Sequence, residues 1–232
     1  MQILQDIKQS LLHLVFPHVC AGCGTDLTTT QNQLCLRCAA ALPQTFFELH
    51  NNNPVEKKLW GRLPLQSATA QYYFTRESLV QQIVHEIKYK GNIALGLQIG
   101  RMMGRSLIQS DRFMADALIP LPLFPEKEKK RGYNQSMVLC KGIADEMQIP
   151  VLNDVIIRPQ FTETQTKKGR IERWKNMDGK FVLKEKSAIA GKHILLIDDV
   201  ITTGATLESC GSEILKAQNT RLSIACVCDA TR

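Results

Sequence analysis

The sequence has no long run of apolar residues, and this absence narrows the classes of protein to which it can belong. A transmembrane helix needs about 20 mostly apolar residues in succession, and the 232-residue chain contains no such run. Its first sixteen residues also lack a basic segment followed by an unbroken apolar core, so they do not read as a signal peptide. We therefore expect a cytoplasmic protein that does not insert into a membrane.

Eight cysteines in such a compartment serve as thiols or metal ligands rather than disulfides. Four of them form two Cys-x-x-Cys pairs, Cys20 with Cys23 and Cys35 with Cys38. Two Cys-x-x-Cys pairs, each forming a turn called a zinc knuckle, can place four thiolates at the corners of a tetrahedron, as structural zinc sites require. The spacing predicts a structural zinc ribbon with no open coordination position. The alternative is a set of free buried thiols.

The net charge of +7 is concentrated in two short stretches. Residues 126–131 carry four basic and two acidic side chains, and residues 160–175 carry five basic and two acidic side chains. Both stretches are interpreted as loops. We expect these loops to surround an anionic ligand, because a solvated surface would spread its charges more evenly.

The chain divides into two expected domains. Residues 1–64 contain an amphipathic helix over 2–15 and the zinc ribbon, and residues 65–232 form a larger domain. In the larger domain, expected strands alternate with expected helices. The strands are expected at 67–74, 117–122, 155–157, 181–183, 194–197 and 221–228, and the helices at 77–89, 93–108, 136–147 and 205–216. This order predicts an α/β fold with a parallel sheet flanked by helices and a ligand site at the carboxyl ends of the strands.

Residues 194–206 combine the features of a phosphate site. Four apolar residues predict a buried strand, Asp198 and Asp199 stand at its end, and a tight turn leads into a helix. Backbone N–H groups at a helix N-terminus bind anions. The expected phosphate-binding residues are Thr202, Thr203, Gly204, Ala205 and Thr206. The two carboxylates would repel a phosphate unless they bind hydroxyl groups or a metal, so a ribose 5-phosphate suits both halves of the motif.

The same thirteen residues resemble the 5-phosphoribosyl 1-pyrophosphate (PRPP) motif of type I phosphoribosyltransferases. That resemblance implies that Asp198 and Asp199 hold the ribose hydroxyls and that Arg131, with Mg²⁺, contacts pyrophosphate, so these three residues are the catalytic candidates. It also implies that the basic stretch with Arg170 is the flexible loop, which makes Arg170 a further phosphate contact.

Together with the four cysteines, these motifs make nearly the whole chain similar to the ComF/GntX family, which is linked to natural competence. Two functions stay open at this stage. One is a phosphoribosyltransferase-like protein that binds PRPP with Mg²⁺ and acts in DNA uptake or utilisation alongside DNA-uptake proteins. The other is a non-catalytic module that binds a nucleotide or single-stranded DNA, with Tyr133 or Trp174 available for stacking. No nucleobase pocket can be recognised in the sequence.

Overall fold

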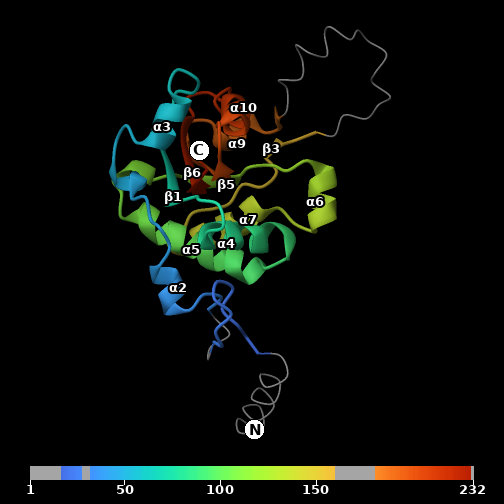
Figure 1. Cartoon of the computed structure of the whole chain (residues 1–232). Coiled ribbons are helices and arrows are strands. Elements are labelled where there is room, and N and C mark those ends of the chain that lie inside the picture. Colours follow the sequence, from blue (N-terminus) through green and yellow to red (C-terminus); the bar gives the residue numbers. More distant parts are fainter. Residues whose placement is uncertain (1–16, 28–31, 160–180, 231–232) are drawn as a thin grey trace.

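The structure is a computed structural model that describes residues 17–27, 32–159 and 181–230 (Figure 1). The expected helix over 2–15 lies outside these residues. So does the whole second basic stretch, residues 160–175, with Arg170 and Trp174. Within the described residues, no helix is long and apolar enough to cross a membrane.

A four-stranded parallel sheet forms the centre of the molecule, with the strand order β1-β6-β5-β2. Its strands are β1 (Ser67–Tyr73), β2 (Ala117–Pro120), β5 (His193–Ile201) and β6 (Arg221–Asp229). A separate antiparallel ribbon pairs β3 (Ile156–Ile157) with β4 (Val182–Leu183). The parallel strands are almost entirely buried, because helices cover both faces of the sheet. The predicted α/β fold is confirmed.

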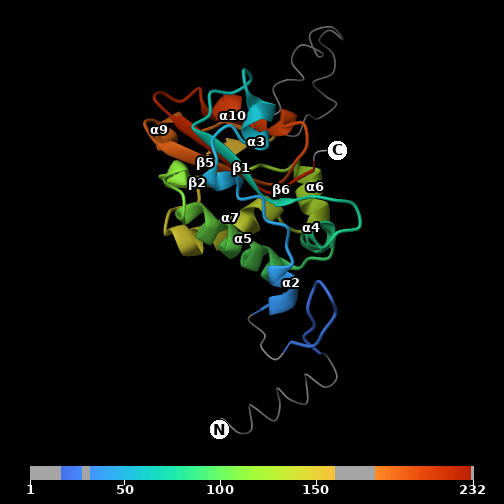
Figure 2. The same ribbon diagram turned by 60° about the vertical axis from the view of Figure 1, so that its left-hand side comes forward.

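The helices form two layers with the sheet between them (Figures 1 and 2). One layer holds α4 (Leu79–Tyr89), α5 (Ile93–Ile108) and α7 (Gln135–Met147), and the other holds α3 (Pro54–Leu59), α9 (Lys186–Ile189) and α10 (Ala205–Ile214). Each face of the sheet packs against one helical layer and forms one hydrophobic core with it. Alternate side chains of β5 point into these two cores: Leu195 and Ile197 pack with the first layer, and Ile194 and Leu196 with the second. The remaining elements are α2 (Leu36–Ala40), η1 (Phe47–Leu49), η2 (Asp111–Phe113) and α6 (Pro125–Arg131).

Helix α6 corrects one expectation, because residues 126–131 were interpreted as a loop. Pro125 occupies the first turn, Glu126 and Glu128 lie near the N-terminus, and the basic residues gather in the last turn. This order of charges complements the helix dipole. Gly132, with a φ of 85°, then ends the helix in the left-handed conformation. The high charge that indicated a loop belongs to an exposed helix.

Helices α5 and α7 meet backbone to backbone, which fixes α7 against the sheet. A Cβ atom on Gly100 would lie 2.4 Å from the carbonyl oxygen of Leu139, and one on Gly142 would lie 2.3 Å from that of Leu97. Only glycine permits this approach. The crossing sets the position of the N-terminus of α7, which faces the carboxyl edge of the sheet.

Segment 43–64, between the expected zinc ribbon and the larger domain, contains η1 and α3. Val55 and Leu59 of α3 are fully buried in the second core, and the Thr45 hydroxyl donates a hydrogen bond to the carbonyl of Ala70 on β1 at 2.5 Å. These contacts join the segment to the larger core. The domain boundary after residue 64 stays a prediction.

Candidate functional site at the carboxyl edge of the sheet

The two aspartates lie at the carboxyl end of β5, between helices of opposite layers. Strands β2 and β5 are neighbours, yet α7, which follows β2, covers one face, and α10, which follows β5, covers the other. In open α/β sheets such a divergence creates a crevice for ligands. The sequence predicted that the strand ends at the aspartates. It continues instead to Ile201, because Val200 and Ile201 still pair with Cys228 and Asp229 on β6.

Asp198 is buried and faces the N-terminus of α7. The Ser136 hydroxyl donates a hydrogen bond to Asp198 Oδ1 at 3.2 Å, and the Asp199 backbone N–H donates to the same oxygen at 2.8 Å. Burial, together with the negative charge of Asp199, raises the pKa of the Asp198 carboxyl to about 7. The carboxyl therefore changes charge near neutral pH.

Asp199 has one paired and one unpaired carboxylate oxygen. Lys88 Nζ, at the end of α4, lies 2.9 Å from Asp199 Oδ1. Asp199 Oδ2 is buried and has no hydrogen-bond partner among the described residues. A buried carboxylate oxygen without a partner is costly. This oxygen is thus a ready acceptor for a ligand hydroxyl, or a ligand atom for a hard cation such as Mg²⁺.

The turn after β5 presents the N-terminus of α10. Thr202 and Thr203 are exposed, and Gly204 is the N-cap, with a φ of 77°. Arg62 donates a hydrogen bond to the Thr203 carbonyl at 2.7 Å and forms an ion pair with Glu208. A Cβ atom at Gly204 would lie 2.8 Å from Leu59 Cδ2. The end of α3 and the residues just after it therefore hold the turn in place.

The other two residues expected in the turn begin α10. Ala205 is exposed, and its N–H donates to the Thr203 hydroxyl at 3.5 Å. Thr206 is partly exposed in the first turn of the helix. The structure thus gathers Asp198, Asp199 and the whole 202–206 segment at one edge of the sheet.

Arg131 lies at the end of α6 and is connected to the aspartates only indirectly, through residues of α7. Its guanidinium donates a hydrogen bond to Gln135 Oε1 and sits 5.5 Å from the centre of the Tyr89 ring. Among the described residues it forms no ion pair with either aspartate. Gln135 immediately precedes Ser136, which bonds Asp198, so α7 links Arg131 to the acid pair.

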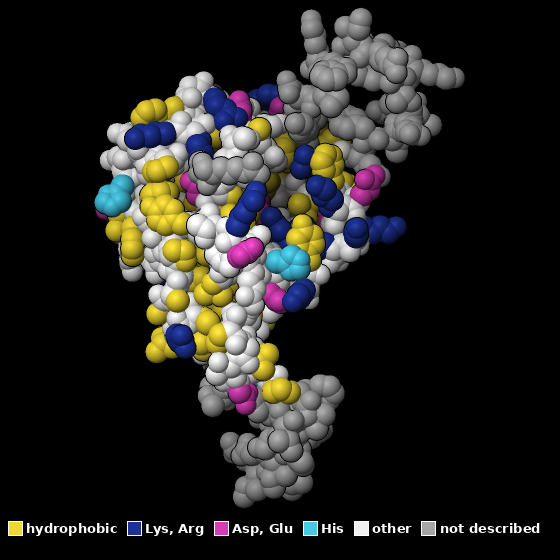
Figure 3. Space-filling view, viewed as in Figure 1, with side chains coloured by type: hydrophobic (Ala, Val, Ile, Leu, Met, Phe, Trp, Pro, Cys, Tyr) yellow, Lys and Arg dark blue, Asp and Glu magenta, His cyan; other side chains and the backbone are white. Residues whose placement is uncertain are grey.

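Basic side chains surround a hollow on this side of the molecule, between the positions of α4, α6 and β5 (Figure 3). Lys88 and Lys90 lie at the end of α4. Lys127, Lys129 and Lys130 are exposed on α6. Their charges give this edge a positive rim around a buried negative pair, an arrangement that attracts anions carrying hydroxyl groups or a metal.

The four knuckle cysteines also come together. The sulfur atoms of Cys20, Cys23, Cys35 and Cys38 all lie within 4.8 Å of one another, and those of Cys23 and Cys35 are 3.7 Å apart. Tetrahedral zinc with Zn–S bonds of about 2.3 Å separates its sulfurs by about 3.8 Å. The backbone N–H of Cys35 also donates to the Cys20 sulfur at 3.2 Å. The residues fit zinc and can bind it.

This cysteine cluster packs against the first helical layer. Gln82 Nε2 of α4 donates a hydrogen bond to the Ala21 carbonyl at 2.6 Å. A Cβ at Gly22 would lie 2.7 Å from Leu79 Cδ1. Cys20 and Cys38 belong to the same hydrophobic cluster as Ile83 of α4. Helix α4 therefore contacts the cysteine cluster near its start and the acid pair at its end.

Comparison with known proteins finds one matching domain family and several relatives of similar length. Residues 134–232 match the family described as "Phosphoribosyl transferase domain". The chain is 25% identical over 215 residues to the DNA utilization protein YhgH of Escherichia coli O157:H7, covering 90% of this chain and 89% of that protein. It is 25% identical over 202 residues to Competence protein F of Haemophilus influenzae, covering 84% and 83%. It is 27% identical over 211 residues to Competence protein ComFC of Bacillus subtilis, covering 89% and 82%. The chain is therefore similar over most of its length to competence and DNA utilization proteins, and its C-terminal part matches the phosphoribosyltransferase domain.

Solved structures similar to this chain are more distant. Glutamine phosphoribosylpyrophosphate amidotransferase from Bacillus subtilis, complexed with ADP and GMP, aligns with 62% of this chain at 17% identity and a TM-score of 0.45. The chain spans 30% of that enzyme. Adenine phosphoribosyltransferase from Leishmania donovani aligns with 78% of this chain and 81% of its own at 12% identity and a TM-score of 0.36.

Sequence reasoning assigned no role at the acid pair to three residues, Lys88, Gln135 and Ser136. Lys88 could be read as a contact for nucleic acid or product, but helix C-termini favour lysine in any case, so its pairing with Asp199 was not expected. Ser136 and Gln135 follow Asn134, whose side chain caps α7. The one available signal was Asn134 before a helix that follows a strand ending in proline, because that order predicts a second helix N-terminus at the same edge.

Proposed function

We propose that this protein is a member of the ComF family and binds PRPP, or a related 5-phosphorylated ribose, together with Mg²⁺ at the acid pair. It would act in DNA uptake during natural transformation or in DNA utilisation. The observation that carries the proposal is the unpaired Oδ2 of Asp199, buried at the carboxyl end of β5 beside the helix N-terminus of α10. A ribose hydroxyl supplies the missing partner, and a 5-phosphate suits the N–H groups of the turn. The biological setting comes from relatives named for competence and DNA utilization.

Each part of the site then has a role. Asp198 and Asp199 accept hydrogen bonds from the two ribose hydroxyls, and the segment from Thr202 to Thr206 holds the 5-phosphate. Mg²⁺ would neutralise the pyrophosphate of the ligand and would be held by ligand oxygens and a carboxylate. Arg131, which contacts Gln135 next to Ser136, is proposed to bind pyrophosphate. Arg170 is proposed as a further contact from outside the described residues.

Calorimetric titration with PRPP and Mg²⁺ tests this site. The double variant Asp198→Asn with Asp199→Asn should lose binding. The matched control changes another adjacent acidic pair, Asp145→Asn with Glu146→Gln, whose members form exposed ion pairs on α7 with Arg101 and Arg105. The control should bind as the wild type does. Equal binding by the acid-pair variant would show that the site is elsewhere.

Turnover is tested separately from binding. If the protein is an enzyme, an acceptor displaces pyrophosphate at the anomeric carbon, and positioning with charge neutralisation supplies most of the rate enhancement. Release of pyrophosphate from PRPP, assayed with candidate nucleobase acceptors, would establish the activity. PRPP binding without release under any acceptor would leave a phosphoribosyl-binding protein.

The second candidate function is a module for single-stranded DNA. The observation that favours it is α6, which has no buried residue and exposes Lys127, Lys129 and Lys130 beside the site. Fluorescence anisotropy with an oligonucleotide should show affinity falling with salt, with a log-log slope of about 0.7 per neutralised phosphate. Changing these three lysines to alanine should flatten the slope. Arg170→Ala with Arg173→Ala tests the second basic stretch in the same way.

Two further properties accompany the proposal. The four-cysteine cluster holds one structural zinc ion, since its sulfur atoms have the spacing of a tetrahedral site. A cytoplasmic location is proposed because all eight cysteines are free in the structure, as a reducing compartment would keep them.

A further inference from the structure

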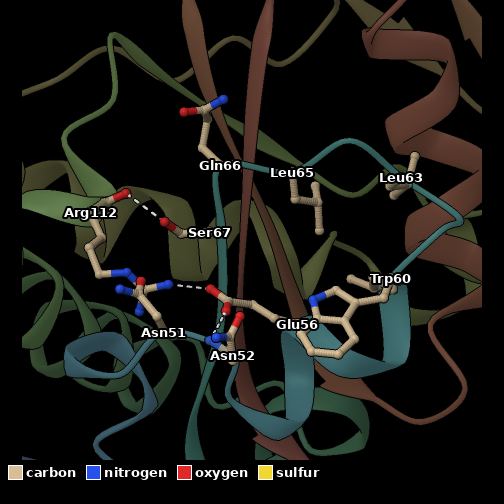
Figure 4. Close-up of a pocket in the computed structure, with 10 residues that line it drawn as sticks. Asn51, Asn52, Glu56, Trp60, Leu63, Leu65, Gln66, Ser67 and Arg112 are labelled. Carbon is tan, nitrogen blue, oxygen red and sulfur yellow. Dashed lines mark hydrogen bonds and ion pairs between the residues drawn. The ribbon is translucent and has the colours of Figure 1, made fainter.

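A second cavity lies beside α3, at the start of β1 (Figure 4). Its volume is about 220 Å³, and its walls come from the 51–52 loop, from α3 and the residues that follow it, from the start of β1 and from Arg112. None of the residues that line it belongs to the acid pair or to the 202–206 segment. The proposed phosphoribosyl ligand therefore gives this cavity no role.

The charged groups of the cavity are already paired with one another. Arg112 forms an ion pair with Glu56 and donates a hydrogen bond to the His50 carbonyl at 2.6 Å. Glu56 also accepts hydrogen bonds from the backbone N–H groups of Ala68 at 3.2 Å and Asn52 at 2.6 Å. Both charged side chains are largely buried. The pair cancels in charge and leaves no free cation, so the cavity does not select a phosphate or another anion.

The groups that are free in the cavity are neutral. Trp60 is 57% exposed, and its indole forms one wall, on the side of Glu56 opposite Asn51 and Arg112 (Figure 4). Within the part of the chain that the structure describes, no hydrogen bond engages the side-chain amides of Asn51 or Asn52. Each amide offers both a donor and an acceptor. A nucleobase can stack its flat face on an indole and hydrogen-bond its polar edge to side-chain amides, so these groups match a nucleobase.

We propose that this cavity binds an uncharged purine or pyrimidine, free or as its nucleoside, which stacks on Trp60 and hydrogen-bonds to the amides of Asn51 and Asn52. The volume lies below the 300–1,000 Å³ of typical drug-sized ligand pockets, so the cavity suits a single base or nucleoside rather than a larger ligand. The site is independent of the acid pair, and its occupant is not the phosphoribosyl ligand.

Adenosine and uridine are the probes. The chain has two tryptophans, Trp60 and Trp174, so the variant Trp174→Phe leaves Trp60 as the only indole. In this variant, either nucleoside should quench the remaining tryptophan fluorescence in a saturable way. Calorimetry on Trp60→Ala should show affinity reduced by about 5- to 150-fold, the range measured when a stacking aromatic is removed. Trp60→Phe keeps an aromatic face and should retain most of the binding.

Two controls separate this site from the acid pair. Tyr89→Ala removes another exposed aromatic, which lies beside Arg131, and it should leave nucleoside binding unchanged. Asp198→Asn with Asp199→Asn should also bind nucleosides normally, although it should lose PRPP. Failure of the phosphoribosyl proposal and failure of this one therefore give different results.

The proposal is overturned if Trp60→Ala, with an unchanged circular dichroism spectrum, binds adenosine as well as the wild type does. Absence of saturable quenching in Trp174→Phe would overturn it too. Equal binding of methyl glucoside would show a sugar site instead. Tighter binding of AMP than of adenosine would contradict the absence of a free cation.

Discussion

Lys88 Nζ lies 2.9 Å from Asp199 Oδ1, so the last turn of α4 places a positive charge against the acid pair. The two side chains are 20% and 7% exposed, which makes this a largely desolvated ion pair. The lysine compensates one of two adjacent carboxylates. Its charge also lowers the pKa of Asp198, against the larger effects of burial and of Asp199. The ionisation of the site therefore depends on a residue from a different helix.

Lys88→Met should destabilise the protein near neutral pH. Removing one member of a largely buried pair leaves the other charge uncompensated, and we expect a loss of roughly 2 kcal/mol in the free energy of unfolding. Lys90→Met is the matched control, because Lys90 is 60% exposed in its pair with Glu86, and it should cost no more than about 0.5 kcal/mol. Urea unfolding at pH 8 measures both. Equal losses would show that Lys88 has no special role.

The ionisation of Asp198 should appear in the pH dependence of stability. Its pKa in the folded protein, about 7, lies above the ordinary value of 3.8, so the folded state holds a proton that the unfolded state releases. This contribution is fully present below about pH 4 and is lost as the pH rises towards 7. Relative to the wild type, Asp198→Asn should therefore gain stability from pH 4 to pH 7 and change little above it. Urea unfolding at several pH values checks this, and a constant difference would refute it.

Purified protein should carry one zinc ion per chain, measured by elemental analysis on protein prepared without chelators. Cys35→Ser should lose the zinc and unfold the cysteine cluster, while the larger domain stays soluble. Cys140→Ser changes a fully buried thiol on α7 that is not one of the four clustered cysteines, and it should keep the zinc. Stoichiometric zinc in Cys35→Ser would mean that the ligand set is different.

Gly204→Ala should cost more stability than Gly191→Ala. Both glycines have positive φ angles, 77° and 74°, and a Cβ at either pays about 1–2 kcal/mol for the left-handed conformation. At Gly191 the Cβ meets nothing within 4 Å, whereas at Gly204 it would press on Leu59. We expect an additional 1 kcal/mol, roughly, for Gly204→Ala, together with weaker PRPP binding. Thermal unfolding and calorimetry provide the two measurements.

The part of the site that could be predicted from sequence is the part that is local in sequence. The strand, the aspartates and the turn occupy thirteen consecutive residues, and the predicted type of each element is confirmed. Ser136 reaches Asp198 across 62 residues, and Lys88 comes from a helix still earlier in the chain. Only the strand order and the glycine contacts between α5 and α7 bring these side chains to the aspartates.

Residues 126–131, which form a helix and not the expected loop, show that composition alone is a weak guide to secondary structure. A run of charges was interpreted as a loop in residues 126–131, although the order of its charges, acidic before basic, favours the helix that forms. Composition alone does not distinguish the two. The roles of Arg131 and Arg170 stay predictions, because one contacts Gln135 in the structure and the other lies outside the described residues.

Helix α4 connects the cysteine cluster to the acid pair, so the zinc content of a preparation should affect ligand binding. Gln82 holds the cysteine cluster and Lys88 holds Asp199, and the helix between them advances only about 9 Å. Molecules that have lost zinc would carry a loosened α4 and would dilute the binding-competent fraction. A titration with a stoichiometry below one, or a batch-dependent affinity for PRPP, would then report incomplete metal loading, and sample quality would have to be judged by zinc per chain before any weak binding is ascribed to the ligand.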